Sequence, residues 1–193
     1  MELFDYLPQF KDWLMCASID GTGDIVEFIR KGIVWEEWLA NFKKGLAAPG
    51  GKDKMLFDLT ITGPGMFSIK DLFDLSLELD VRIETKIMFA FHADIVFSPF
   101  AWPKHILNRH LDELLAYIEP KATPKQQTLV NTLKGMKDRQ TFQEQWPETH
   151  EEQFFNGRNY QEQLDRIRQE QFRLEDIYKR DPELYEWWTR EKK

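Results

Sequence analysis

The stretch Ser18-Ile19-Asp20-Gly21-Thr22-Gly23 decides how the fold of this chain is interpreted. An apolar run at residues 13–19 leads into it and has the length of a buried strand, and residues 24–29 after it predict a short helical turn. In an open α/β sheet, ligands lie off the carboxyl ends of the strands, and glycines let backbone N–H groups point at them. A plain strand-to-helix turn has a similar composition, so the stretch alone leaves both interpretations open.

The composition predicts one domain of ordinary size with an appended arm. Of the 193 residues, 42% are hydrophobic, which is enough for a real core, and 31% are charged. The 15 Phe and seven Trp must be buried or must meet a partner. A net charge of −7 argues against broad nucleic-acid binding, which needs an excess of Lys and Arg.

The single cysteine, Cys16, excludes an internal disulfide and any multi-cysteine metal site made by this chain alone. Because Cys16 lies in the apolar run, we expect it to be a small buried hydrophobe rather than a reactive thiol. The sequence has no apolar stretch long enough to span a bilayer and no visible signal peptide. We therefore expect a cytoplasmic protein with no membrane partner.

Strands and helices alternate through the first half of the chain. Apolar residues alternate with polar ones at 54–62 and again at 81–91, so these segments are predicted as the second and third strands after 13–19. Helices are predicted at 35–46 and 69–79, the second with a capping box formed by Ser68 and Asp71. Connections of this length predict parallel strands with right-handed crossovers. Three such strands leave two open edges.

The second half of the chain is predicted to be helical. After an extended connector at 98–103, helices are expected at 104–118 and 121–139, and the region of Trp146 is expected to be a loop. The tail from residue 160 carries an apolar stripe in which Gln171 fills one heptad position: Leu164, Ile167, Gln171, Leu174 and Tyr178. We expect the tail to pack over the sheet, although a coiled-coil arm stays an alternative. The predicted division is an α/β region at 1–103 and a helical extension at 104–193.

Few polar residues outside the opening stretch suggest a site. His92 and Asp94 follow the third predicted strand, on the same sheet edge as Ser18 and Asp20, although solvated loop residues would have the same pattern. Asp58 and Glu84 lie on predicted strands and face either solvent or a bound group. His105 and His110 are five residues apart, which does not place two zinc ligands on one helix face, so both are expected at the surface.

An ordered set of motifs resembles a known family. The run 18–23, Phe28-Ile29-Arg30, Trp35 and Asn41 is similar to the fourth-strand region of radical S-adenosylmethionine (radical SAM) enzymes with a twitch-type C-terminal extension. The similarity extends from about residue 10 to the end of the chain, through these segments: Leu59-Thr60-Ile61-Thr62, Ser98-Pro99, Trp102-Pro103, Leu164-Asp165-Arg166-Ile167-Arg168 and Asp181-Pro182-Glu183-Leu184.

The resemblance implies a partial (β/α)6 barrel, of which this chain would form the C-terminal three strands. By position, Ser18, Asp20 and Gly21 would line the ribose side of S-adenosylmethionine, and Arg30 would bind its methionyl carboxylate through two charge-assisted bonds. A surface salt bridge of Arg30 to Glu27 or Asp24 is the structural alternative. The substrate-side residues implied are Thr62, His92 and Asp94. The catalytic residues and the substrate stay unknown.

The sequence also departs from this family. The three-cysteine motif that holds the iron–sulfur cluster is missing, because Cys16 is the only cysteine, and Gly65 replaces an expected asparagine. The expectation is therefore a split or truncated enzyme that is inactive alone and needs a complementary N-terminal half-barrel chain to supply the cluster. The alternatives are a non-catalytic remnant that binds a partner, or itself, through sheet edges and aromatic helices, and, less favoured, a stand-alone S-adenosylmethionine-binding module.

Overall fold

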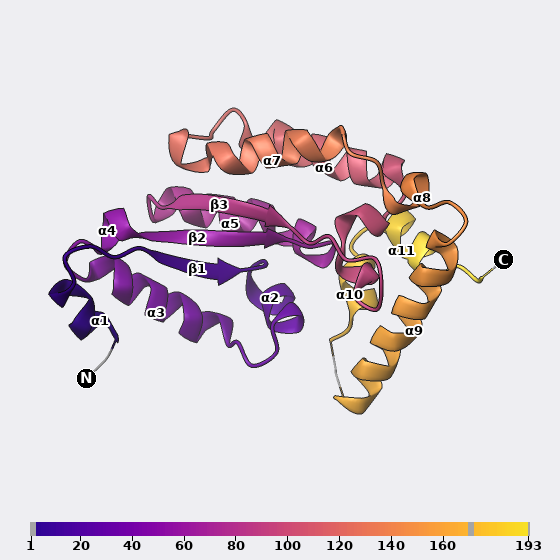
Figure 1. Ribbon diagram of the computed structural model, residues 1–193, viewed down its shortest axis with the longest axis horizontal. Coiled ribbons are helices and arrows are strands. Elements are labelled where there is room, and N and C mark those ends of the chain that lie inside the picture. The colour runs from indigo at the N-terminus through magenta and orange to yellow at the C-terminus, as the bar shows by residue number, and fades with distance from the viewer. Residues whose placement is uncertain (1–2, 170–171, 193) are drawn as a thin grey trace.

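The computed structural model describes residues 3–169 and 172–192 and has a three-stranded parallel sheet at its centre (Figure 1). The strands are β1 (Met15–Ile19), β2 (Met55–Ile61) and β3 (Arg82–Ile87), in the spatial order β1-β2-β3. Ser18 pairs with Asp58, and Asp58 pairs with Glu84, so the three strands run in register. The predicted parallel α/β arrangement is confirmed. Nothing in three strands shows a barrel, which stays a prediction.

Two connections link the strands. The first consists of α2 (Gly23–Ile29), α3 (Trp35–Ala47) and α4 (Gly51–Lys54), and the second of η2 (Pro64–Ser68) and α5 (Ile69–Glu78). Helix α3 begins at Trp35 as predicted, and the apolar stripe on its inner side explains why it packs against the sheet. The predicted capping box is wrong, because the Ser68 hydroxyl makes no bond to the start of α5. It donates instead to the Gly65 carbonyl at 3.2 Å.

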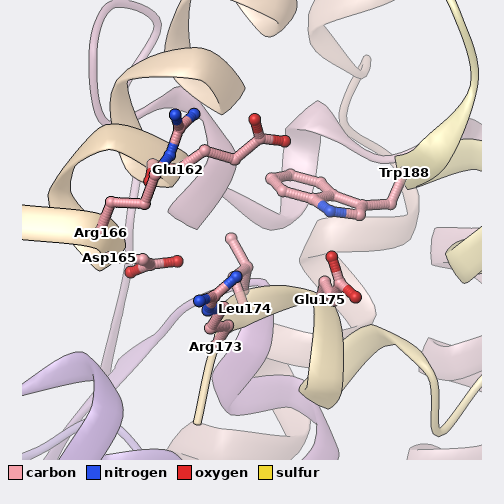
Figure 2. Close-up of a pocket in the computed structure, with 7 residues that line it drawn as sticks. All are labelled: Glu162, Asp165, Arg166, Arg173, Leu174, Glu175 and Trp188. Carbon is pink, nitrogen blue, oxygen red and sulfur yellow. The ribbon is translucent and has the colours of Figure 1, made fainter. Parts of the chain in front are cut away.

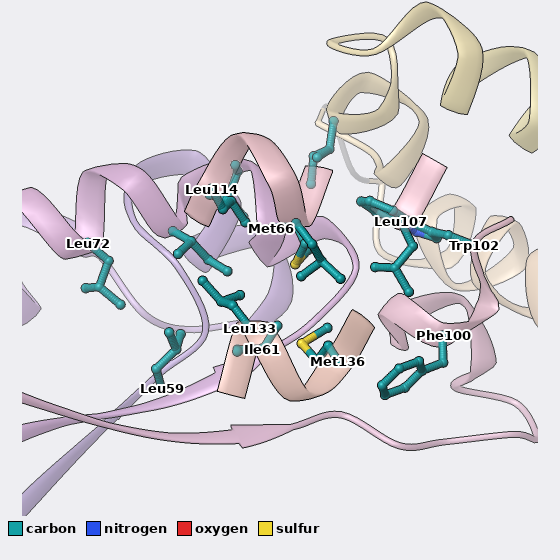
Figure 3. Close-up of a cluster of buried hydrophobic side chains, with 14 of the residues drawn as sticks. Leu59, Ile61, Met66, Leu72, Phe100, Trp102, Leu107, Leu114, Leu133 and Met136 are labelled. Atoms are coloured by element: carbon teal, nitrogen blue, oxygen red, sulfur yellow. The ribbon is translucent and has the colours of Figure 1, made fainter. Parts of the chain in front are cut away.

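One face of the sheet is covered by helices. Alternation along β2 directs Met55, Phe57, Leu59 and Ile61 to this face, where each is at least 96% buried. The Phe57 ring lies 4.6 Å from the Phe42 ring of α3, measured between centroids. Figure 3 shows Leu59 and Ile61 extending toward Leu72 of α5 and toward Leu114 and Leu133 of the later helices. Both crossovers therefore bury their apolar sides on the same face.

The opposite face is mostly polar and open, except at Leu56, which is only 2% exposed. The intervening positions of the three strands point to it: Cys16, Ser18, Leu56, Asp58, Thr60, Arg82, Glu84 and Lys86. Cys16, Arg82 and Lys86 are exposed, so this face is accessible to solvent. The prediction that Cys16 is buried is wrong, because its position in β1 alternates away from the helices. We call this surface the open face.

The second half of the chain extends the helical layer and caps one end of the sheet. Its first part contains η3 (Ile95–Phe97), η4 (Pro99–Ala101), α6 (Lys104–Ile118), η5 (Pro124–Gln126) and α7 (Gln127–Lys137). Helix α7 lies along β3, and the hydroxyls of Thr85 and Thr132 are 2.6 Å apart. The last helices are α8 (Phe142–Gln145), α9 (His150–Ile167), α10 (Leu174–Tyr178) and α11 (Pro182–Thr189). The first helical segments are α1 (Leu3–Tyr6) and η1 (Leu7–Gln9).

The tail differs from its prediction. Helices α9, α10 and α11 lie beyond the carboxyl ends of the strands, against the loops there, rather than over a face of the sheet (Figure 1). Ile167 is 77% exposed, while Leu174 and Tyr178 are buried, so the predicted single stripe is interrupted. Gln171 lies outside the described residues. The Tyr178 hydroxyl donates to the Val96 carbonyl at 3.0 Å, which fixes the cap to the end of the sheet.

Three further boundaries differ. Strand β3 ends at Ile87 rather than at residue 91. The segment expected to be an extended connector contains the 3-10 turn η4, and α8 and the first half of α9 occupy a region expected to be a loop. The core contains residues from both sides of the predicted boundary at 103/104, such as Phe57 and Leu133. The division into two domains stays a prediction.

Candidate functional site

A hydrogen-bonded polar row crosses the open face from the ends of β1 and β3 to the middle of β2. The Ser18 hydroxyl of β1 donates to Asp58 Oδ2 of β2 at 3.0 Å. Lys86 Nζ of β3 donates to the same oxygen at 2.6 Å. The side chain of Asp58 is 23% exposed and that of Lys86 is 53% exposed. One carboxylate thus joins all three strands while solvent still reaches the row.

The row has a defined charge state. The hydrogen bond from Lys86 has the largest effect on the pKa of Asp58 and lowers it below its ordinary value. Burial opposes this as the second largest effect, and the hydrogen bond from the Ser18 hydroxyl lowers the pKa further. The positive charge of Arg30 also lowers this pKa. Asp58 is therefore ionised at neutral pH, and Arg30 belongs to the same electrostatic environment.

Asp20 and Arg30, both predicted site residues, form an ion pair with each other. Arg30 Nε donates to Asp20 Oδ2, and a second guanidinium nitrogen lies 3.4 Å from Oδ1. Asp20 is 5% exposed, whereas the Arg30 side chain is 35% exposed. Arg30 therefore does not pair with Glu27 or Asp24, the partners of the structural alternative. Glu27 accepts from the Trp35 backbone N–H, and Asp24 pairs with Arg180. A guanidinium held in this way keeps exposed N–H groups for a ligand.

The glycine-rich loop after β1 packs closely against the loop after β2. A side chain at Gly21 would clash with the Ser68 hydroxyl, which accepts a hydrogen bond from the Thr22 N–H at 3.2 Å. A side chain at Gly65 would clash with the Asp20 carbonyl, so an asparagine would not fit at 65. Gly21 thus has a packing role, and the Thr22 N–H is already bonded within the protein. Ligand binding by Gly21 stays a prediction.

The three predicted substrate-side residues differ in their exposure and in their hydrogen bonds. Thr62 is 3% exposed, and its hydroxyl accepts the Gly65 N–H at 2.9 Å, which holds the turn into η2. His92 and Asp94 are exposed, and their backbone carbonyls accept the hydrogen bonds that form η3. Because β3 ends at Ile87, they do not directly follow the strand. Among the described residues, the structure gives no hydrogen bond or ion pair between these side chains and Ser18, Asp20 or Arg30.

Lys86 is a residue that sequence reasoning missed. The same alternation that predicted the apolar side of 81–91 places Glu84 and Lys86 on the other side, so the pattern contained the signal. The structure also decides the orientation of Asp58 and Glu84. Both lie on the open face, where Glu84 pairs with Arg82 at 3.2 Å.

A second polar group was predicted incorrectly. His110 of α6 is buried, and its Nε2 lies 2.7 Å from Asp181 Oδ2, while His105 is exposed as expected. Asp181 also pairs with Arg109 at 2.8 Å and accepts the backbone N–H of Leu184 at 3.0 Å. This arrangement joins α6 to the first turn of α11. Each group has an internal partner, so we interpret it as a structural connection.

A pocket of about 290 Å³ lies between α9 and α10–α11 (Figure 2). It is lined by Glu162, Asp165, Arg166, Arg173, Leu174, Glu175 and Trp188. Acidic and basic groups alternate around it, with Leu174 and the Trp188 ring between them (Figure 2). Gln161 Nε2 already donates to Asp165 at 2.7 Å. This mixture of charges favours no particular ligand class.

The described part of the chain has neither a metal-binding cluster nor a membrane-spanning helix. Within residues 3–169 and 172–192, no group of three or more His, Cys, Asp or Glu side chains is arranged to hold a metal ion. No helix in the same residues has the length and apolar character needed to cross a membrane. Comparisons with known proteins found no matching family model, no matching curated protein and no matching solved structure.

Proposed function

We propose that this chain is the C-terminal half-barrel part of a radical SAM-like enzyme. It provides the ribose and carboxylate side of an S-adenosylmethionine site, together with a helical cap next to the substrate, and another chain completes the site. The observation that carries the proposal is the one-sided sheet. Helices cover one face, while on the other face Asp58, in the middle of β2, is bonded to Ser18 and Lys86, each one residue before the carboxyl end of its strand.

A one-sided parallel sheet is unusual for a chain that acts alone. Parallel sheets are normally covered on both faces, or close into a barrel whose inner face contains the ligand site at the carboxyl ends. The in-register order β1-β2-β3 and the helices on one face match a segment of such a barrel. A polar open face without a cover has the character of the interior of a larger cylinder.

The polar groups at the rim fit S-adenosylmethionine by their chemistry. Its ribose hydroxyls are donors that require acceptors, which the Asp58 carboxylate and the Ser18 hydroxyl oxygen present side by side at 3.0 Å. Its methionyl carboxylate requires a positively charged, planar donor, which Arg30 offers from its pair with Asp20. Asp20 then acts by holding Arg30 rather than by contacting the ribose. Together with Asp20 and Arg30, the polar row presents two carboxylates and two positively charged groups. This balance suits a ligand that is itself a zwitterion.

An iron–sulfur cluster does not fit this chain alone. Such clusters are held by several thiolates, and the chain contains only Cys16, which lies exposed on β1. The cluster must therefore come from a partner chain, and no chemical step is assigned to residues of this chain. The same open edges would serve a non-catalytic interaction protein. The bonded polar row favours a ligand site, because a surface used only for protein contact does not require it.

The test is co-expression with a chain that carries a Cys-x-x-x-Cys-x-x-Cys motif and three βα units, such as one encoded next to this one. We expect an iron-containing complex that binds S-adenosylmethionine and cleaves it under a reductant. In that complex, Arg30→Ala should weaken binding by on the order of tenfold or more, because a charge-assisted bond is lost.

Two control variants separate charge from geometry. Arg30→Lys retains a positive charge beside Asp20 but loses the planar pair of N–H donors, so it should recover only part of the affinity. Arg180→Ala removes an exposed pair with Asp24 at 2.7 Å and should leave the affinity unchanged. A colourless mixture that does not associate would contradict the proposed function, and unchanged binding by Arg30→Ala would remove Arg30 from the site.

A further inference from the structure

Within residues 3–169 and 172–192, no strand lies beside the outer edge of β1. Strand β1 is at the end of the order β1-β2-β3, and the described hydrogen bonds of its ladder go to β2. The opposite edge strand, β3, has α7 along it. An edge of this kind presents backbone N–H and C=O groups that are ready to pair with another strand.

An apolar groove lies directly beside this edge. It encloses about 160 Å³ and is lined by Phe4, Met15, Ala17, Trp38, Asn41, Phe42 and Met55. Met15, Ala17 and Met55 belong to the face that the helices cover, so the groove lies next to α3 on that side of the sheet. Phe4 of α1 lines the groove as well, so the groove is bounded by α1 and α3.

The segment that leads into β1 exposes large apolar side chains. Phe10 is 61% exposed and Leu14 is 59% exposed, and Leu3 and Tyr6 of α1 are also exposed. Single exposed apolar residues are ordinary, but several around one unpaired edge and one apolar groove indicate an interface. Among the described residues, β3 itself carries no exposed large apolar side chain, although Phe89, two residues after its end, is 52% exposed.

We infer that the edge of β1 and this groove bind a strand–helix unit of another chain, its strand parallel to β1 and its helix in the groove. The inference rests on the proposed function and states where its partner docks. Three features of the sheet select this occupant. The existing ladders are both parallel, the existing crossover helices both lie on the groove side, and right-handed crossovers place the next helix there as well. The added strand would direct apolar residues to the groove and polar ones to the open face.

A second copy of this chain fits less well. Two copies related by a twofold axis would pair their β1 strands antiparallel. That arrangement would break the parallel order and would place two identical α1 segments at the junction instead of a new helix. Self-association is therefore an outcome that the experiment must detect.

Cys16 gives a native reporter for this edge. It is the only cysteine of the chain, is exposed, and lies in β1. In the co-expressed complex, N-ethylmaleimide modification of the peptide containing Cys16 would be followed by mass spectrometry and compared with that in the free chain. We expect the modification rate to fall on the order of tenfold or more in the complex, since a partner that pairs with β1 and continues the barrel also closes over the open face, onto which the Cys16 side chain points.

A groove variant tests the helix contact. Ala17→Glu places a carboxylate in the apolar groove and should weaken association by on the order of a hundredfold. Circular dichroism of the free variant checks that it still folds. Leu14→Ser removes an exposed apolar side chain at the edge and should weaken association less. Ile167→Ser is the matched control, since Ile167 is also an exposed apolar side chain but lies on α9 rather than at the edge of β1.

The outcomes separate this inference from the proposed function. If the complex forms and cleaves S-adenosylmethionine while Cys16 stays reactive and Ala17→Glu still associates, the docking surface is wrong and the function stands. If the chain alone forms a dimer in which Cys16 is protected, a second copy is the occupant and the inference is overturned. If no complex forms, both the function and the docking surface are contradicted.

Discussion

The two faces of the sheet use the same three strands in opposite ways. On the covered face, Phe57, Leu59 and Ile61 are fully buried against helices, and the contacts there are apolar. On the open face, Ser18, Asp58 and Lys86 are partly exposed and are joined by hydrogen bonds. The covered face therefore supplies stability through the hydrophobic effect, whereas the open face keeps polar groups in a fixed arrangement at little gain in stability.

This contrast indicates how a three-stranded parallel sheet remains folded with one face uncovered. The second half of the chain adds apolar surface to the covered side and seals the carboxyl ends with Tyr178 and its neighbours. The fold thus concentrates its core on one side. The other side is left available for a partner or ligand.

Truncation of Phe57 should have the largest effect on the free energy of unfolding. Phe57→Ala leaves a cavity against Phe42 and Trp38 and should lower the free energy of unfolding by about 3–5 kcal/mol. Thr60→Ala on the open side of the same strand should change it by less than about 0.5 kcal/mol. Urea unfolding followed by circular dichroism measures both. Equal losses from the two variants would contradict the difference between the faces.

A substitution in the glycine-rich loop after β1 should have the next largest effect on stability. Gly21→Ala forces a methyl group against the Ser68 hydroxyl and should cost about 1–3 kcal/mol, the range for overpacking. Gly135→Ala in α7 is the matched control, because a methyl group there meets nothing within 4 Å. It should stabilise the protein by about 0.5–1 kcal/mol through helix propensity. If Gly21→Ala were neutral, the close packing of the two loops would be wrong.

The helices at the carboxyl end should respond to pH. Burial lowers the pKa of His110, more than Asp181 raises it, and burial also lowers the pKa of His150. The unfolded chain therefore binds more protons, so stability is complete above the ordinary histidine pKa of about 6.5 and falls as the pH drops below it. Between pH 7.5 and 5.5 we expect the melting temperature to fall by about 2–4 °C for each kcal/mol lost.

Histidine variants assign this pH dependence. His110→Gln should reduce the difference in melting temperature between the two pH values, because one of the two buried imidazoles is gone. His150→Gln should reduce the difference in the same way, because burial also lowers the pKa of His150. A melting temperature that rises toward pH 5.5 would show that the direction assigned to these groups is wrong.

The polar row should have the smallest effect on stability. Lys86→Met breaks the pair with Asp58, but both side chains reach solvent, so the loss should be below about 1 kcal/mol. Thermal unfolding at low and high salt measures it, with Lys134→Met, which breaks a more exposed pair with Glu119, as the reference. A loss above about 2 kcal/mol would mean that the open face serves stability rather than a ligand.

The strands and the first helices could be predicted because their signals are local. Apolar alternation defined β2 within one residue at each end, and the apolar spacing of α3 gave its first residue. The tail was harder to predict, because Ile167 fits a helical stripe but no neighbouring element covers it. Periodicity shows which side of an element is apolar. It does not show whether another element reaches that side.

The candidate site could be predicted only in part. Ser18, Asp20 and Arg30 were singled out from the sequence, and the structure places them at one rim, while Lys86 was missed and His110 was assigned to the surface. Asp58 was placed on a strand, but the sequence did not show which face of the sheet it points to. Side chains from different strands meet only when the register is known, and neither composition nor spacing specifies register between segments that far apart.

The sequence by itself determined the alternation of strands and helices, the apolar side of each strand and the absence of a cysteine set for a cluster. Only the tertiary structure decided that one face stays open, that Asp58 connects Ser18 with Lys86, and that Asp20 holds Arg30. The physical reason is the distance along the chain over which each signal acts. Burial patterns repeat every two to four residues along the chain, whereas a polar site depends on how distant segments come together in space.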